Sequence, residues 1–281
     1  MQRRNRWGAA AAVLALASLA LIGCSLKAED PTRLAAAATP AVSAGVAGSP
    51  RPIPSGSYGE LIRYGQNIIQ HTRKVMPANV GAALTCESCH LSAGTKPHGG
   101  SLIGAYIQFP QWNARSKRFI ALEDRLAECY LYSMNGRPPA YTSREMVALT
   151  AYIAWLSNGQ AVGSKPEGRA LITFAPDRAP DPHIGQAVYA QKCAACHGAT
   201  GAGSASFPPL WGDRSFNDGA GMHRLSTMAA FARYNMPFGG PPNTLSKQAA
   251  YDVSAFVLSH SRPHFATSRK IAFPALPAGF F

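Results

Sequence analysis

Acidic residues are scarce in this chain of 281 residues. It has 14 Asp and Glu against 27 Lys and Arg, which gives a formal net charge of +13. Such an excess of positive charge favours attraction to an anionic substrate or to an acidic redox partner. The basic residues do not form the basic-aromatic pattern that suggests nucleic-acid binding, so we expect no nucleic-acid partner.

Segments with strand-like alternation are also lacking, so we expect a mostly α-helical chain. One helix is expected over residues 118–134, where Asn135 and Gly136 end it. The next is expected to begin at Thr142, with Glu145 completing a capping box. Ser246 is the expected N-cap of the last helix.

No apolar run is long enough to predict a transmembrane helix with confidence. The run from Gly8 to Ile22 follows three arginines, which is the pattern of an export signal. It ends in LIGC, which resembles the bacterial lipobox and predicts a lipidated mature N-terminus at Cys24. A plain cleaved signal and an uncleaved anchor are the alternatives. The serine after the cysteine favours a lipoprotein of the periplasm held at the outer membrane.

Only six cysteines are present, and five of them have a ready explanation. Cys24 is assigned to the lipid, and four lie in the motifs CESCH and CAACH. In a CxxCH motif the two thiols form thioethers with haem, and the histidine coordinates the iron. A zinc site would need two more Cys or His ligands close to each motif, and the sequence lacks them. We therefore expect two covalent haem c groups, attached through Cys86, Cys89, Cys193 and Cys196, with His90 and His197 as proximal ligands.

The two motifs divide the chain into two units of the same plan, so we expect two cytochrome c-like haem domains in tandem. Residues 25–56 are rich in Ala, Pro, Ser and Gly and predict a flexible tether. The expected segments are a signal peptide (1–23), a lipidated N-terminus and linker (24–56), a first haem domain (57–160), an interdomain linker (161–180), a second haem domain (181–262) and a C-terminal tail (263–281).

In the second domain, PPL at 208–210 resembles the Pro-Leu of class I cytochromes c, in which the proline carbonyl holds the proximal histidine. Met236 in NMPFG resembles the distal methionine of that class. Met222 and Met228 are the alternatives as iron ligands, and core packing is their expected role.

In the first domain the candidate distal ligands are Met76, Cys129 and Met134. Cys129 shares a helical stripe with Arg125 and Ser133, at a spacing of four residues. It therefore lies at the edge of the buried face, beside a cation that favours the thiolate. A thiolate is a good soft ligand for iron.

CESCHLSAG, RLAECYLYSMNG, FPPLWG and GAGMHRLSTMAAFARYNMP together resemble the dihaem thiosulfate dehydrogenases that form tetrathionate. The resemblance covers residues 58–262. It implies that the first haem is the active site with His90 and Cys129 as axial ligands. It also implies that His197 and Met236 hold a second haem, which relays electrons. Asn235 stands where some members have an alternative lysine ligand, so we expect a plain His/Met centre.

The resemblance further implies that Arg125 and Ser133 belong to the active site, and Arg115 less securely. Arg115 is alternatively a solvated residue or a partner of a haem propionate, and Ser133 alternatively satisfies the helix end. A lipid anchor would be a departure, because the known members are soluble periplasmic proteins.

The expected reaction joins two thiosulfates into tetrathionate and passes two electrons to an external acceptor such as a small cytochrome c. Arginines suit the sulfonate oxygens. The alternatives are a non-catalytic dihaem electron carrier, a haem subunit that conjugates thiosulfate to a carrier protein, and a tetrathionate reductase working in the reverse direction. The sequence does not fix the direction, since it depends on reduction potentials.

Overall fold

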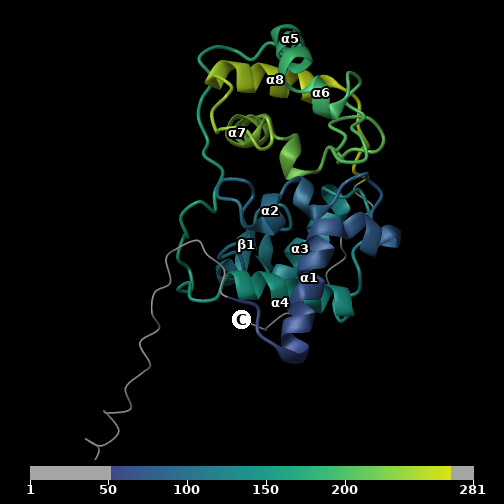
Figure 1. Ribbon diagram of the computed structural model, residues 1–281, viewed down its shortest axis with the longest axis vertical. Helices are drawn as coiled ribbons and strands as arrows, with labels where there is room; N and C mark the ends of the chain where they lie inside the picture. Colours follow the sequence, from purple (N-terminus) through teal and green to yellow (C-terminus); the bar gives the residue numbers. More distant parts are fainter. Residues whose placement is uncertain (1–51, 267–281) are drawn as a thin grey trace, which may run out of the picture. The chain divides into compact units, whose positions relative to one another are not determined.

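The computed structural model describes residues 52–266 of the chain (Figure 1). The predicted signal peptide, Cys24 and most of the linker lie outside the described residues, as does most of the tail. Within residues 52–266, no helix has both the length and the apolar character needed to cross a membrane.

The structure confirms a mostly α-helical fold. Short 3₁₀ turns occur at Pro77–Asn79, Cys86–Ser88, Tyr106–Gln108 and Gly221–His223. The longer elements are α1 (Gly56–Val75), α2 (Leu91–Gly94), β1 (Gln111–Asn113), β2 (Arg118–Ile120), α3 (Leu122–Tyr132), α4 (Arg144–Leu156), α5 (Pro182–Lys192), α6 (Ala194–His197), α7 (Leu225–Asn235) and α8 (Lys247–Ser259).

Helices α1 and α4 pack against each other and form the core of the first domain (Figure 1). A Cβ atom at Gly65 would lie 2.1 Å from the carbonyl oxygen of Ala148, so only glycine allows this close approach. The predicted capping box of α4 is wrong. Ser143 is the N-cap and accepts a hydrogen bond from the backbone N–H of Met146 (3.2 Å), while Glu145 accepts one from the hydroxyl of Tyr64 (3.0 Å).

The expected helix over 118–134 is shorter in the structure, because its first residues form a strand. β1 and β2 pair antiparallel, with Trp112 opposite Phe119. α3 starts only at Leu122, where the carboxylate of Asp124 accepts a hydrogen bond from the N–H of Ala121 (3.0 Å). The sequence did not reveal this short hairpin. Three residues per strand are too few for an alternating pattern to be recognised.

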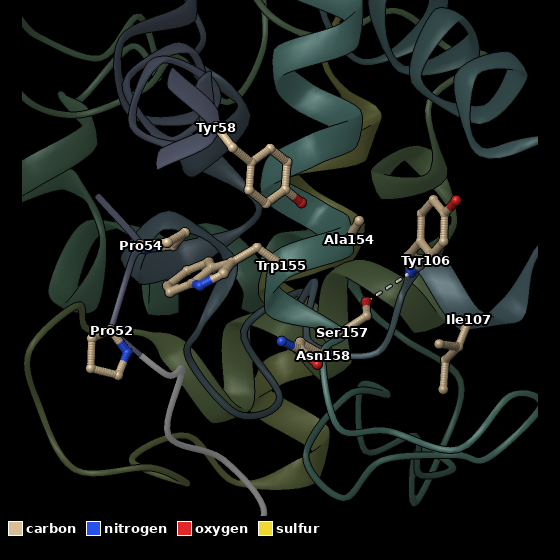
Figure 2. Close-up of a pocket in the computed structure, with 9 residues that line it drawn as sticks. All are labelled: Pro52, Pro54, Tyr58, Tyr106, Ile107, Ala154, Trp155, Ser157 and Asn158. Atoms are coloured by element: carbon tan, nitrogen blue, oxygen red, sulfur yellow. Dashed lines mark hydrogen bonds between the residues drawn. The ribbon is translucent and has the colours of Figure 1, made fainter. Parts of the chain in front are cut away.

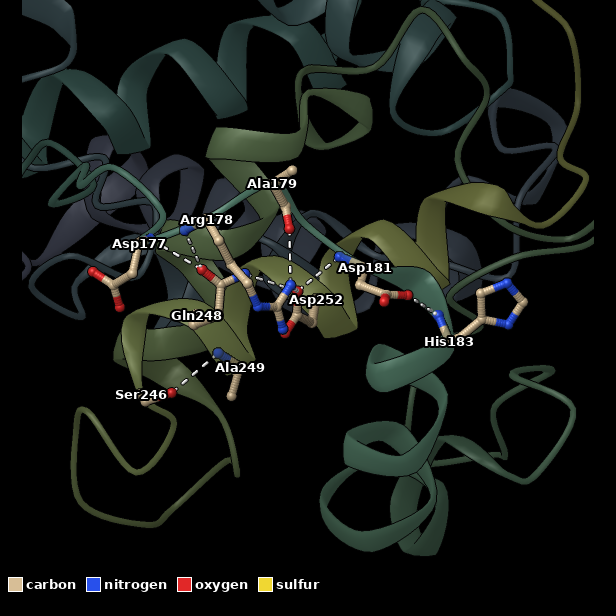
Figure 3. A network of polar contacts seen from close by, with 9 residues as sticks. All are labelled: Asp177, Arg178, Ala179, Asp181, His183, Ser246, Gln248, Ala249 and Asp252. Atoms are coloured by element: carbon tan, nitrogen blue, oxygen red, sulfur yellow. Dashed lines mark hydrogen bonds and ion pairs between the residues drawn. The ribbon is translucent and has the colours of Figure 1, made fainter.

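In the second domain α8 packs against both α5 and α7 (Figure 1). Ser246 caps α8 as predicted, accepting a hydrogen bond from the N–H of Ala249 (3.1 Å). The nearly inaccessible carboxylate of Asp252 ties the linker to α8 (Figure 3). It accepts hydrogen bonds from the side chains of Arg178 (2.7 Å) and Gln248 (2.9 Å) and from the N–H of Asp181 (2.8 Å).

One hydrophobic cluster joins residues of both domains. Leu131, Tyr132 and Met134, at the end of α3, pack in the same cluster as Met228 and Tyr251 of the second domain. Hydrogen bonds reinforce this contact. The fully buried Asn217 donates one from its amide to the carbonyl of Leu131 (2.8 Å).

Candidate functional site

The first CxxCH motif follows the last turns of α1. Thr72, fully buried near the end of that helix, accepts a hydrogen bond from the N–H of Cys86 (3.0 Å). Its hydroxyl donates to the carbonyl of Ile68 (2.7 Å). Thr72 therefore fixes where the motif begins. A threonine in an amphipathic helix carries no functional signal, so the sequence did not reveal this role.

His90 is oriented by a backbone carbonyl that the sequence analysis did not find. Its Nδ1 lies 2.5 Å from the oxygen of Gly100. A carbonyl only accepts hydrogen bonds, so Nδ1 donates and Nε2 keeps the lone pair that a metal requires. Gly100 has φ +70°, and a Cβ there would lie 2.3 Å from the carbonyl oxygen of Cys89, which explains the glycine.

Burial lowers the pKa of His90, and the positive charge of Arg125 acts in the same direction, while the hydrogen bond with Gly100 opposes them. The imidazole is therefore neutral at neutral pH, as a metal ligand must be. The loop between His90 and Gly100 is held at Ala93. The carboxylate of Glu87 accepts a hydrogen bond from its N–H (2.7 Å), and the hydroxyl of Tyr152 donates to its carbonyl (2.8 Å).

The second motif is built in the same way. Nδ1 of His197 lies 2.9 Å from the carbonyl oxygen of Pro208, as the PPL sequence predicted. The hydroxyl of Tyr189 donates to the carbonyl of Gly198 (2.6 Å), the residue after the motif. Burial lowers the pKa of His197, against the opposing effect of the bond to Pro208. The imidazole is therefore neutral, and its Nε2 also keeps a lone pair that can bind a metal.

The methionines of the second domain differ in their packing. Met228 is buried in the hydrophobic cluster and Met222 packs against it, as expected for core residues. Met236, the residue directly after α7, is half-buried and belongs to neither of the two hydrophobic clusters of residues 52–266. Asn235 is turned toward the first domain, where its amide donates to the carbonyl of His98 (2.9 Å).

The three candidate distal ligands of the first domain are also distinguished by their packing. Met76 is buried and accepts a hydrogen bond from the hydroxyl of Tyr130 (3.0 Å), and Met134 is buried in the cluster shared by the domains. Cys129 belongs to neither cluster and lies close enough to the thiols of Cys86 and Cys89 for their charges to interact. Cys129 is therefore within electrostatic range of the CESCH motif.

Arg125 is not a free cation. Its guanidinium lies 2.9 Å from the carboxylate of Glu128, which also accepts a hydrogen bond from the amide of Asn113 (2.8 Å). Burial raises the pKa of the Cys129 thiol, Arg125 lowers it, and Glu128 raises it further. The predicted effect of Arg125 on Cys129 is right in sign, but burial outweighs it. Sequence spacing did not reveal Glu128, since it lies beside the stripe.

The other two predicted active-site residues lie at the end of α3 and in the turn of the β1–β2 hairpin. Ser133 is the C-cap residue of α3, half-buried, and its N–H donates to the carbonyl of Cys129 (2.9 Å). Arg115 comes from the turn between β1 and β2. Its guanidinium stacks on the ring of Tyr132 at 3.9 Å and donates to the carbonyl of Gly219 in the second domain (2.8 Å). Tyr132 in turn lies near Arg125.

A pocket of about 360 Å³ lies elsewhere, between the start of α1 and the end of α4 (Figure 2). Its lining includes Tyr58, Tyr106 and Trp155, and the hydroxyl of Ser157 accepts a hydrogen bond from the N–H of Tyr106 (3.1 Å). It contains none of the predicted ligands or catalytic residues, so the chemistry is not assigned to it.

Comparisons with known proteins agree with the division of the chain into two cytochrome c domains. Residues 77–162 match the family model "SoxA/TsdA, cytochrome c domain", and residues 183–261 match the model "Cytochrome c". The thiosulfate dehydrogenase of Allochromatium vinosum is 38% identical over 265 residues, which cover 91% of this chain and 94% of that protein. The chain belongs to the thiosulfate dehydrogenase family.

Two further members show the same relationship. The thiosulfate dehydrogenase of Stutzerimonas stutzeri is 41% identical over 75% of this chain and 70% of that protein. The structure titled thiosulfate dehydrogenase (TsdBA) from Marichromatium purpuratum, in its as isolated form, superposes with a TM-score of 0.73 and 33% identity. That match covers 81% of this chain but only 51% of the solved chain, so this chain spans about half of its length.

Membership in the thiosulfate dehydrogenase family and the two cytochrome c matches confirm the prediction of two covalent haem c groups. The residues of each motif fit such a group, because both histidines have Nδ1 bound to a carbonyl and Nε2 free. The ranges of the two matches lie close to the predicted haem domains, whose boundaries stay predictions.

Proposed function

We propose that this thiosulfate dehydrogenase homologue joins two thiosulfate ions into tetrathionate beside the first haem. In this proposal His90 and Cys129 would coordinate the iron of that haem, and His197 and Met236 the iron of the second. A haem bound at the second motif would supply the route for the electrons to an external acceptor such as a small cytochrome c. The observation that carries the proposal is that Cys129 belongs to neither hydrophobic cluster and interacts electrostatically with the CESCH thiols, while Met76 and Met134 are core residues.

The charges of the substrate explain why arginines belong to this site. Two unit charges about 4 Å apart repel by about 1 kcal/mol in water, and two dianions repel by several times more. Arg125, half exposed beside Cys129, is the first candidate to offset this repulsion. Arg115 is the second, and its contact with Tyr132 brings it to the same helix. Ser133 is proposed to donate its hydroxyl to a substrate oxygen.

We further propose that Cys129 bonds covalently to substrate. Cys129 would first leave the iron, and its thiolate would then form an S–S bond with the sulfane sulfur of one thiosulfate. This oxidation releases two electrons, which two bound haems could accept, one each. The sulfane sulfur of a second thiosulfate then attacks the sulfur bound to Cys129. This forms the central bond of tetrathionate and returns the electron pair of the broken bond to the Cys129 thiolate.

A thiolate ligand lowers the reduction potential of a haem and a methionine ligand raises it. The proposed ligands therefore favour flow from the first haem to the second. Asn235, beside Met236, already donates its amide to His98 and Phe231, which supports a plain His/Met centre.

The decisive assay combines purified protein, thiosulfate and ferricyanide and measures the tetrathionate formed. Electron paramagnetic resonance of the oxidised protein is expected to show a low-spin thiolate signal for one haem. Two His/Met signals without tetrathionate would favour the electron carrier instead. Mass spectrometry of substrate-treated protein is expected to find added mass on Cys129, and an unmodified Cys129 would argue against the covalent step.

We also propose that the protein works in the periplasm, anchored to the outer membrane by lipid on Cys24. The support is the LIGC sequence after an export signal, followed by Ser25. When cells that express the full chain are grown with labelled fatty acid, the label is expected to be incorporated into the protein. Replacement Cys24→Ala should abolish the label, and label that persists would exclude this site.

A further inference from the structure

A segment of the interdomain linker packs on the loop that orients His90. The N–H of His98 donates to the carbonyl of Gly168 (2.6 Å), and the imidazole Nδ1 of His98 lies 2.8 Å from the carbonyl of Ala170. A Cβ atom on Gly104 would come within 2.3 Å of Pro166, so the two segments are in close contact. Residue 169, between these anchors, therefore has a fixed position beside the first haem loop.

Arg169 occupies this position with an unsatisfied side chain. Its Nε is buried and has no hydrogen-bond partner among residues 52–266. A buried donor without a partner is unfavourable unless another group supplies an acceptor. Burial lowers the pKa of Arg169, and the positive charge of Arg125 lowers it further.

The two arginines differ in how their charge is balanced. Arg125 is paired with Glu128, whereas no ion pair is found for Arg169 within the described part of the chain. A cation with a buried donor that lacks a partner is stabilised by an anion that contacts it. The planar guanidinium offers paired N–H groups that match the oxygens of a sulfonate or a carboxylate.

We propose that Arg169 forms an oxyanion-binding site beside the first haem, where Arg125 adds a second positive charge. The inference rests on the proposed function, because it assigns substrate chemistry to that haem. The oxyanion is either the sulfonate of a free thiosulfate or a propionate of the first haem. If the oxyanion is thiosulfate, Arg169 binds one of the two substrate ions through its positive charge. If it is a propionate, Arg169 is a positioning residue that fixes the haem.

The test compares the haem-loaded variants Arg169→Gln and Arg169→Lys with wild type. Arg63→Gln is the matched control, since it removes one positive charge from an exposed position on α1. Three quantities are measured: the KM for thiosulfate, the inhibition constant of sulfate as an anion that is not oxidised, and the midpoint potential of the first haem. Lysine keeps the charge and should restore part of any loss, and it also serves if the glutamine variant folds poorly.

If thiosulfate is the oxyanion, Arg169→Gln should raise KM and the sulfate constant by about tenfold or more, the effect of losing one charged hydrogen bond. If a propionate is the oxyanion, KM should stay constant and the potential of the first haem should fall, because the lost cation favours ferric iron. The proposal is overturned if all three quantities match those of Arg63→Gln. The thiolate signal of the first haem, recorded on the same samples, tests the proposed ligation independently.

Discussion

The pairing of Arg125 with Glu128 makes a specific prediction for Glu128→Gln. The carboxylate is nearly inaccessible, with 7% of the side chain exposed, whereas Arg125 is 49% exposed. Glutamine keeps an oxygen that can accept the hydrogen bond from Asn113 and removes only the negative charge. Because Arg125 is half exposed, we expect the lost ion pair to cost only about 1 kcal/mol of stability.

The same change should strengthen substrate binding. A dianion that contacts the free side of Arg125 would lie about 8 Å from the Glu128 carboxylate, where the repulsion is about 1 kcal/mol even with the screening of water. Removing it should lower the KM for thiosulfate by roughly fivefold, since 1.4 kcal/mol corresponds to a factor of ten. The effect should shrink at high salt, which screens charges.

Steady-state kinetics with ferricyanide over a range of ionic strengths checks this prediction. Glu123→Gln is the matched control, because it removes a carboxylate from the first turn of the same helix, where Glu123 accepts a hydrogen bond from Thr150 (3.1 Å). A KM that stays constant or rises in Glu128→Gln, relative to this control, would refute the electrostatic reasoning. It would mean that Glu128 holds Arg125 in place rather than opposing the substrate.

Three further predictions concern ligation and stability. Cys129→Met should retain both haems but abolish turnover and raise the potential of the first haem, as a redox titration would show; full activity would contradict the assignment. Burial alone would raise the pKa of Asp252, but hydrogen bonds from its neighbours, including Arg178, lower it below its ordinary value of 3.8. The network in Figure 3 therefore stabilises the fold when the pH is above 3.8. This stabilisation is lost as the pH falls through the lowered pKa of Asp252. Asp252→Asn should cost about 2 kcal/mol near neutral pH and little in strong acid, as measured by thermal unfolding against pH. Asn217→Ala should cost about 1–3 kcal/mol by removing the buried hydrogen bonds from its amide to Leu131 and Asn135, and an unchanged melting temperature would contradict this role.

The sequence predicted what depends on covalent spacing. The two CxxCH motifs, the Pro-Leu carbonyl for His197 and the capping Ser246 all act over a few residues, so the local sequence is enough to find them. The position of Cys129 relative to Arg125 followed from helix periodicity, because residues four apart share a face. The sequence alone could not show which side chains pack in the core. The structure was needed to place Met76 and Met134 in hydrophobic clusters.

Contacts between distant segments could not be predicted in this way. Gly100 orients His90 through a carbonyl that every residue possesses, so its role depends on the path of the loop and not on its side chain. Thr72 and Asn217 are polar residues that act because they are buried against particular backbone groups. The hairpin that carries Arg115 was missed because its two strands are short and pair only with each other.

Helix α3 explains why the proposed active site is rigid. One face, with Leu122 and Tyr130, packs in the cluster of the first domain, and the last turn, with Leu131 and Tyr132, packs in the cluster shared with the second. Cys129 belongs to neither cluster and is within electrostatic range of the CESCH motif. A helix held on two sides cannot rotate without disrupting both clusters, since closely packed interiors resist such movement. Changes at the contact between the domains should therefore reach the proposed iron ligand through α3 itself, without any contact with substrate.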